Sequence, residues 1–298
     1  MKSREVSRRQ LLRQAAVSGL VIAAAPAVVA CGSSAPATSA GNISGFRAKL
    51  AYADYAPFSF KQQDVYTGLS VALINEIFGS LKIQTESVTT GDWSGLIPGL
   101  LAGRYNLIGT GLVMQSARCA QVAFTDPFVA SKEIFAFRKG ESRGLKTLDD
   151  VKNASGVRLG VIAGSAEIPL VKQGGIPDAQ TALLPDTASA FSALGARRVD
   201  VLMMDNVGAP YYIINSKSED QFEVSEPFAV LVDGKPQISY SAMAFPKSET
   251  AVLEAFNSEL KKILENGRAV ELTKNFGGTA AMFDDARQHT AGEVCGTP

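Results

Sequence analysis

The sequence has very few histidines and cysteines, two residue types that hold metal ions or take part in nucleophilic catalysis. His289 is the only histidine, and the chain has three cysteines. Neither a CxxC nor an HExxH motif occurs, so no spacing typical of a metal site is present. No pair of nucleophile and base is recognisable either. We therefore expect no cofactor, no metal and no enzymatic activity.

Clustered positive charge is also missing from the body of the chain. Removing residues 1–30 takes five basic side chains and one acidic side chain from totals of 29 each, which leaves 24 and 28 and a net charge of −4. A nucleic-acid-binding surface needs clustered Lys and Arg to displace counterions from phosphates. We expect no nucleic acid as a partner.

One long apolar run is present, and it lies at the N-terminus. Residues 15–30 are almost free of charge but are interrupted by Ser18, Gly19 and Pro26. The run is short for a membrane span of ~20 residues, and basic residues precede it, as in a signal peptide. Residues 1–30 are predicted to be an export signal.

Two short motifs refine this prediction. Arg8 and Arg9, followed by leucines, resemble a twin-arginine export signal, although an arginine pair can also precede an ordinary secretory leader by chance. Residues 28–31 (VVAC) resemble a lipobox, whose cysteine, here Cys31, is acylated and becomes the first mature residue. We expect an exported protein anchored by lipid to the outer face of the cytoplasmic membrane.

The mature chain is expected to begin with a linker and continue as a large folded body. Residues 35–45 (APATSAGNISG) have no charge and no bulky side chain before Ile43, so residues 31–45 cannot bury enough apolar area to offset chain entropy. About 250 residues follow, which is enough for one large domain or two cores.

Hydrophobic periodicity predicts an α/β fold with two lobes. Short apolar strands alternate with helical patterns twice, as expected for βαβ units and mainly parallel sheets. The first series comprises strands at 49–53, 83–88 and 105–109 and helices at 68–81 and 93–102; the second comprises strands at 157–161, 181–184 and 199–204 and helices at 165–173 and 187–194.

Two further apolar runs, 134–137 and 240–245, bracket the second series and read as strands that pass between the lobes. Lobe 1 is predicted to comprise residues 46–138 and 240–298, and lobe 2 residues 139–239. Two crossings make a hinge with a cleft between the lobes. Cys119 and Cys295 have the opportunity to form a disulfide outside the cell, but the sequence does not decide whether they do.

The order of several motifs resembles that of the family 3 solute-binding proteins, the extracytoplasmic receptors of ABC importers. The segments that carry the resemblance are YAPFSF (55–60), TG (67–68), WSGLIP (93–98), AGRYNLI (102–108), Arg118, FTDP (124–127), LGV (159–161) and VD (199–200). Within that family, residues 118–124, 175–180, 184–186 and 232–236 resemble ectoine and hydroxyectoine receptors. The resemblance implies a type II periplasmic-binding-protein fold that closes on a small zwitterion.

The resemblance also implies an anion site in the cleft. Arg118 matches the carboxylate-binding arginine of the family, because a guanidinium offers two parallel donors. Thr110 and Gly111, on a loop after a strand, and Gly164 and Ser165, at the start of a helix, match positions whose N–H groups face the ligand carboxylate. Taken alone, Arg118 would more often lie on the surface, and Gly164 and Ser165 would form an ordinary strand-to-helix turn.

The cationic end of the ligand is assigned by the same resemblance. Asp205 matches the carboxylate that accepts the ligand ammonium, although an Asp at this position is also a common helix N-cap. Tyr55 and Trp93 match aromatic side chains around the ligand, with Phe58 as a further possible contact. Aromatic side chains are more often part of a core. Val113 departs from the family pattern, which has a hydroxyl or an aromatic side chain there, so the identity of the ligand stays open.

The sequence thus predicts a monomeric receptor for a polar amino acid or a related zwitterion such as ectoine, with ABC permease subunits as partners. Two alternatives remain. One is a dehydratase-like enzyme of the same fold, in which Asp54, Asp92 or Asp205 would act as acid or base. The other is a sensory lipoprotein without a permease.

Overall fold

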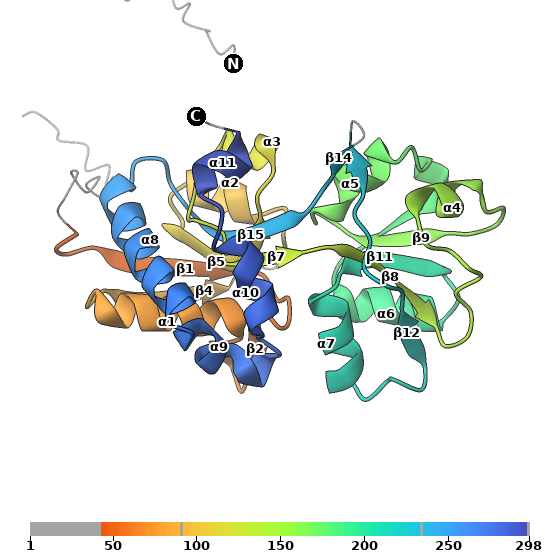
Figure 1. Cartoon of the computed structure of the whole chain (residues 1–298), viewed down its shortest axis with the longest axis horizontal. Helices are drawn as coiled ribbons and strands as arrows, with labels where there is room; N and C mark the ends of the chain where they lie inside the picture. The colour runs from red at the N-terminus through yellow and green to blue at the C-terminus, as the bar shows by residue number, and fades with distance from the viewer. Residues whose placement is uncertain (1–42, 90–91, 233–234, 297–298) are drawn as a thin grey trace, which may run out of the picture. The chain divides into compact units, whose positions relative to one another are not determined.

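The computed structural model describes residues 43–89, 92–232 and 235–296 (Figure 1). The predicted export signal, Cys31 and most of the predicted linker lie outside the described residues. None of the helices in the described ranges combines the length and the hydropathy that crossing a membrane requires.

The first sheet has the strand order β4-β1-β5-β15-β6, and β7 pairs with β15. Three strands are parallel to one another, whereas β15 runs antiparallel to its neighbours. In Figure 1 the blue strand β15 lies in the same sheet as β1, although β15 comes from the C-terminal part of the chain. The strands are β1 (Arg47–Tyr52), β4 (Gln84–Thr89), β5 (Leu107–Val113), β6 (Ala123–Phe124), β7 (Val129–Ser131) and β15 (Ser239–Phe245).

Apolar side chains alternate between the two faces of this sheet because successive residues of a strand point to opposite sides. On β15, Met243 and Phe245 join the cluster that contains α1 and α8, and Ala242 and Ala244 join the cluster that contains α2. The helices of this half are α1 (Leu69–Ser80), α2 (Leu96–Leu101), α3 (Ser116–Cys119), α8 (Thr250–Glu265), α9 (Arg268–Thr273), the short η2 (Lys274–Phe276), α10 (Ala280–Ala286) and α11 (Ala291–Cys295).

The second sheet has the order β10-β9-β11-β8-β12, with three parallel strands followed by two antiparallel pairings. Its strands are β8 (Glu133–Arg138), β9 (Leu159–Ile162), β10 (Thr181–Leu184), β11 (Val201–Asp205) and β12 (Phe222–Val224). Its helices are α4 (Leu148–Asn153), α5 (Glu167–Gln173), η1 (Asp178–Gln180), α6 (Thr187–Gly195) and α7 (Gly208–Asn215). Two small hairpins complete the elements: β2 (Phe60–Gln62) with β3 (Val65–Thr67), and β13 (Leu231–Val232) with β14 (Lys235–Pro236).

The chain passes between the sheets twice, and the first passage comes earlier than the sequence indicated. Strand β8 pairs with β11 and β12, so residues 133–138 belong to the second sheet and the passage lies between Ser131 and Glu133. The expected boundary at residue 138 placed this strand in lobe 1. All six residues of β8 are buried, and an apolar run of this kind predicts a strand covered on both faces without showing which sheet it joins. The return to the first sheet comes at β15.

The start of α1 supports the loop that carries Tyr55 and Phe58. The backbone N–H of Leu69 donates to the Pro57 carbonyl at 2.7 Å, and the Ser70 hydroxyl donates to the Phe58 carbonyl at 2.6 Å. The preceding Gly68 has φ +125°, and a Cβ there would lie 2.6 Å from the Pro57 carbonyl oxygen. Only glycine fits this junction without strain.

Replacing Gly68 by alanine is therefore expected to lower the free energy of unfolding by about 1–3 kcal/mol, because φ is unfavourable for alanine and the backbone blocks its Cβ. Gly79, in the last turn of α1, is the matched control, because nothing lies within 4 Å of a Cβ at that position. Gly79→Ala is expected to be neutral or stabilising by up to about 1 kcal/mol. Chemical denaturation of both variants measures the difference, and equal stabilities would contradict this account of the junction.

Candidate functional site

A pocket lies between the two sheets and takes its walls from both. It is lined by seven of the eight residues assigned from the sequence: Tyr55, Phe58, Trp93, Gly111, Arg118, Ser165 and Asp205. Residues that the sequence analysis did not assign also line it, among them Val113, Glu167 and Met204. One buried apolar cluster contains residues of both sheets, including Tyr55 and Met204, so the lobes are in contact around the pocket.

Arg118 reaches from the first lobe to the second. It lies on the four-residue helix α3, and its guanidinium donates to the carbonyl of Val113 at 2.9 Å and to the carbonyl of Gly164 at 3.0 Å. Among the described residues no carboxylate forms an ion pair with it. Burial lowers the pKa of Arg118 to about 10, and the nearby Glu167 offsets this only in part. A guanidinium has five N–H donors, so two carbonyls leave donors for an anionic ligand group.

Asp205 ends β11 and uses both of its oxygens. Oδ1 accepts hydrogen bonds from the backbone N–H groups of Val207 at 2.8 Å and Gly208 at 2.7 Å, where α7 begins. Oδ2 accepts a hydrogen bond from the Tyr55 hydroxyl of the first lobe. Asp205 thus supports the start of α7, as the alternative reading of the sequence indicated, and it also faces the pocket. The single carboxylate of Asp205 can therefore support α7 and face a ligand at the same time.

Aromatic rings form one wall of the pocket. Tyr55 is stacked on Phe58 with ring centroids 5.9 Å apart, and its edge contacts Trp93 at 5.5 Å. A Cβ at Gly111 would overlap Phe58, and a Cβ at Gly208 would overlap the Tyr55 hydroxyl. Burial and the neighbouring Asp205 raise the pKa of Tyr55, so its hydroxyl acts as a neutral donor. The wall offers π faces that attract a cation.

The structure revises three details of the predicted anion site. Thr110 and Gly111 lie within β5 and not on a loop after it. Thr110 is fully buried away from the pocket, where its hydroxyl accepts a hydrogen bond from the backbone N–H of Ala53 at 2.8 Å and contacts the Ser59 hydroxyl at 2.8 Å. Thr110 therefore supports the loop that carries Tyr55. The residue type threonine does not by itself indicate this buried role in the sequence.

The third detail concerns Ser165. Its backbone N–H donates to the Ile162 carbonyl at 3.2 Å, and α5 begins two residues later, at Glu167. The N–H of Ser165 is therefore occupied within a turn. Its hydroxyl lies in the pocket near the Glu167 carboxyl but without hydrogen-bond geometry, and this oxygen is buried without a partner among the described residues. The hydroxyl is the group that Ser165 offers to a ligand.

Comparison with known proteins gives this pocket a context. A sequence model of the bacterial extracellular solute-binding proteins, family 3, matches residues 40–279. The chain belongs to this family.

Individual relatives agree with this assignment. The chain is 27% identical to the arginine-binding extracellular protein ArtP of Bacillus subtilis, over 84% of this chain and 92% of that protein. It is 29% identical to a probable histidine-binding protein of Campylobacter jejuni, over 75% of this chain and 81% of that protein. The crystal structure of EhuB in complex with hydroxyectoine superposes with a TM-score of 0.73 at 28% identity, covering 83% of this chain and 93% of that one. The expected family and fold are confirmed.

Two buried glutamates in this solute-binding protein escaped the sequence analysis. Glu167 lines the pocket and is 8% exposed; burial, and then the charge of Asp205, raise its pKa to about 7. Glu133 is 3% exposed and lies opposite Asp205 in the pairing of β8 with β11. Burial and the neighbouring Glu167 and Asp205 raise the pKa of Glu133 well above its usual range. Glu167 is the first residue of α5. In a sequence, an acid at this position is explained by its favourable interaction with the helix dipole, so nothing indicates that it is buried.

No cluster of three potential metal ligands is found among the described residues. Asp54 and Asp92, considered as alternatives for acid–base chemistry, do not line the pocket of Arg118. They line a neighbouring cavity, of which Trp93 is a shared wall.

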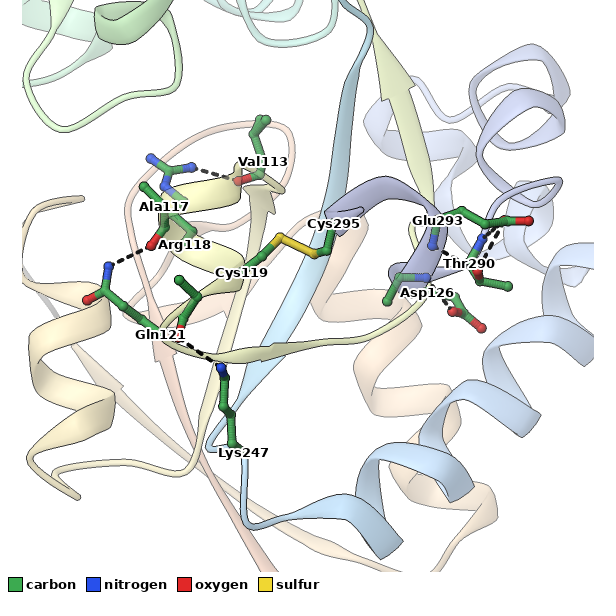
Figure 2. The surroundings of a disulfide bond; sticks show 12 residues. Val113, Ala117, Arg118, Cys119, Gln121, Asp126, Lys247, Thr290, Glu293 and Cys295 are labelled. Atoms are coloured by element: carbon green, nitrogen blue, oxygen red, sulfur yellow. Dashed lines mark hydrogen bonds between the residues drawn. A yellow bond between two sulfur atoms is a disulfide. The ribbon is translucent and has the colours of Figure 1, made fainter. Parts of the chain in front are cut away.

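A disulfide holds the helix that carries Arg118. Cys119 on α3 is bonded to Cys295 on α11, with a Cα–Cα distance of 5.8 Å (Figure 2). Ser116 and Ala117 of α3 are exposed, and Arg118 and Cys119 are only half-buried, so packing contributes little to the position of this helix. Nearby, Lys247 donates to the Ala120 carbonyl at 2.8 Å. The pairing that the sequence left open is present, and it places a covalent link one residue from Arg118.

Replacing Cys119 and Cys295 by serine is expected to lower stability by about 2–5 kcal/mol and to increase hydrogen exchange in residues 116–119. Ligand affinity is expected to fall, because Arg118 loses the support of its helix. The control is the wild-type protein with a reductant, which should behave like the double variant, while the variant itself should not respond to reductant. Unchanged exchange at residues 116–119 would show that other contacts hold α3.

The two raised glutamate pKa values predict how stability depends on pH. A carboxyl whose pKa is higher in the folded than in the unfolded state stabilises the fold fully below its unfolded pKa, and this stabilisation is lost as the pH rises through the folded pKa. For Glu167 that window runs from about pH 4.5 to about 7. The ligand-free protein should therefore lose thermal stability between pH 5 and pH 8, and Glu167→Gln should show a smaller loss. A melting temperature that rises over this range would contradict the prediction.

Proposed function

We propose that this protein is the ligand-capturing receptor of an ABC importer and that its ligand is a small zwitterion, either a polar amino acid or a cyclic solute of the ectoine type. The observation that carries the proposal is the arrangement of charges: Arg118 from one lobe and Asp205 from the other face the same pocket. Relatives named for arginine and histidine and a structural neighbour bound to hydroxyectoine support this ligand class.

In this proposal the ligand carboxylate binds the remaining donors of Arg118, and the hydroxyl of Ser165 adds a further bond. The ligand cation lies near Asp205 and against the rings of Tyr55, Phe58 and Trp93, where a desolvated cation gains about 2 kcal/mol or more from the aromatic faces. Gly111 contributes by its lack of a side chain, because the ring of Phe58 occupies the space that a Cβ at this position would need.

Closure follows from the distribution of these groups over the two lobes. A ligand that contacts Arg118 on one side and Asp205 on the other binds the closed form more tightly than the open form, so it shifts the population toward closure. The permease then distinguishes a loaded receptor from an empty one by its closed shape. The protein acts as a monomer, tethered outside the cell by lipid on Cys31 after export directed by residues 1–30.

One observation favours a second candidate, the dehydratase-like enzyme. Glu167 lies in the pocket with a pKa of about 7, which is a suitable value for a general acid or base. An enzyme would convert its ligand, whereas a receptor returns it unchanged. NMR of bound and released ligand separates the two candidates. The sensory lipoprotein is separated from the importer by whether permease and ATPase genes adjoin the gene for this chain.

The purified protein, residues 32–298, should gain thermal stability from at least one member of a panel of amino acids, ectoine, hydroxyectoine and betaines. Arg118→Ala should weaken binding about 10- to 100-fold, because a hydrogen bond to a charged group contributes about 1.5–3 kcal/mol. Arg118→Lys should restore little, since an ammonium lacks the planar fork. Asp205→Asn keeps an oxygen that can face α7, and it should weaken mainly the binding of ligands that carry a primary amine.

The exposed Arg104 provides the control. Arg104→Ala removes the same charge from the first lobe outside the pocket and should leave binding unchanged. The proposal fails if no member of the panel stabilises the wild-type protein, or if Arg118→Ala and Arg104→Ala have the same effect.

A further inference from the structure

The pocket contains more carboxyl groups than its single guanidinium can neutralise. Glu167 comes from the start of α5, Asp205 from the end of β11, and Glu133 from the start of β8, directly opposite Asp205. Glu167 and Asp205 line the pocket together with Arg118, whereas Glu133 is buried beside Asp205 and is not part of the lining. With all three acids ionised, these four side chains would carry a net charge of −2.

The three acids are not equally supported. Asp205 accepts hydrogen bonds at both oxygens from Tyr55 and the start of α7. Glu133 accepts one from the Ser239 hydroxyl at 3.2 Å, and its Oε2 is buried with no partner among the described residues. Glu167 has no cationic partner within ion-pair distance among the same residues. Buried carboxylates without partners favour the protonated form, so Asp205 is the best-supported anion of the three.

We propose that Glu167 sets the net charge of the ligand that this pocket accepts. With Glu167 protonated, the pocket holds a zwitterion of net charge zero, and with Glu167 ionised it favours a ligand that carries a further cationic group. This inference rests on the proposed receptor function and adds the residue that selects among ligands of that class.

The groups that face Glu167 come from each element packed around it. Arg118 of α3 stabilises its ionised form, while burial and Asp205 of β11 oppose it; Glu133 of β8 is a neighbour whose own pKa is raised by Glu167. The Ser165 hydroxyl and the backbone N–H of Glu167 favour the anion, and Tyr55 contributes a neutral hydroxyl. A ligand cation near Glu167 would add to the first group, whereas a zwitterion whose carboxylate pairs with Arg118 would weaken that group and favour the protonated form of Glu167.

The titration range of Glu167 makes this selection sensitive near neutral pH. Its pKa of about 7 means that both protonation states are populated there. If binding of a ligand shifts the pKa of Glu167 by one unit, the affinity for that ligand differs about tenfold between the fully protonated and the fully ionised state of Glu167. Charge selection should therefore vary with pH while the shape of the pocket stays the same.

L-arginine and L-citrulline test the proposal, because they have the same length and differ in the charge of the side-chain end group. Affinities are measured by titration calorimetry at pH 5.5 and pH 8.0 for the wild type and for Glu167→Gln. The preference of the wild type for arginine over citrulline should rise about tenfold between the two pH values. In Glu167→Gln the preference should be independent of pH. Glu219→Gln, an exposed residue of the second lobe, is the matched control and should behave like the wild type.

The outcomes separate the inference from the proposed function. A wild-type preference that does not change with pH, or an equal change in Glu167→Gln, overturns the role of Glu167. If another panel member binds in place of these two, calorimetry in two buffers of different ionisation enthalpy should show proton exchange at pH 7 in the wild type and none in Glu167→Gln. Binding without proton exchange overturns the inference alone. Absence of binding by the whole panel overturns the proposed function and the inference with it.

Discussion

The desolvated guanidinium of Arg118 is the interaction on which the rest of the site depends. It is held by two carbonyl oxygens, one from each lobe, and by no carboxylate among the described residues. Carbonyls fix its direction without neutralising its charge, so the cation keeps its attraction for an anionic ligand group. An internal ion pair with a carboxylate would neutralise the arginine and reduce that attraction. A ligand would then have to break the ion pair before it could bind the guanidinium. Keeping the charge unpaired requires rigid support, which the Cys119–Cys295 bond gives to a helix whose residues are exposed or only half-buried.

The side of the pocket opposite Arg118 has an excess of carboxyl groups. Asp205 is supported by the start of α7 and by Tyr55 from the other lobe, so one hydrogen bond connects the acid to the aromatic wall. Glu133 and Glu167 share the same buried region; burial and then the charge of Asp205 raise the pKa of Glu167, and burial and then the charges of Glu167 and Asp205 raise the pKa of Glu133. A family 3 solute-binding protein with this pocket responds to the charge of its ligand as well as to its shape. The proposal for Glu167 follows from this imbalance.

The succession of elements could be predicted well from the sequence. Alternating periods placed helices α1 and α6 close to their observed bounds, because each buries one apolar face and therefore has a clear repeat. Strand β10 was placed at its observed bounds, Thr181–Leu184. Elements that lack such a repeat were missed, including α3, α4 and the hairpin of β2 and β3. Strand β8 was recognised as a strand but placed in the wrong lobe, since an apolar run does not identify the strands beside it. The positions of Arg118, Asp205 and the aromatic residues came from the family resemblance and not from periodicity.

By itself the sequence determined the fold class, the family and half of the residues that line the pocket, because these depend on local pattern and on motif order. The tertiary structure decided which polar groups are buried and what they face. Thr110 lies in the core, the N–H of Ser165 is occupied within a turn, and Glu167 is an acid enclosed between Arg118 and Asp205. The physical reason is that the charge state of a side chain depends on its solvation and on neighbours distant in sequence, and only the folded chain brings those neighbours together.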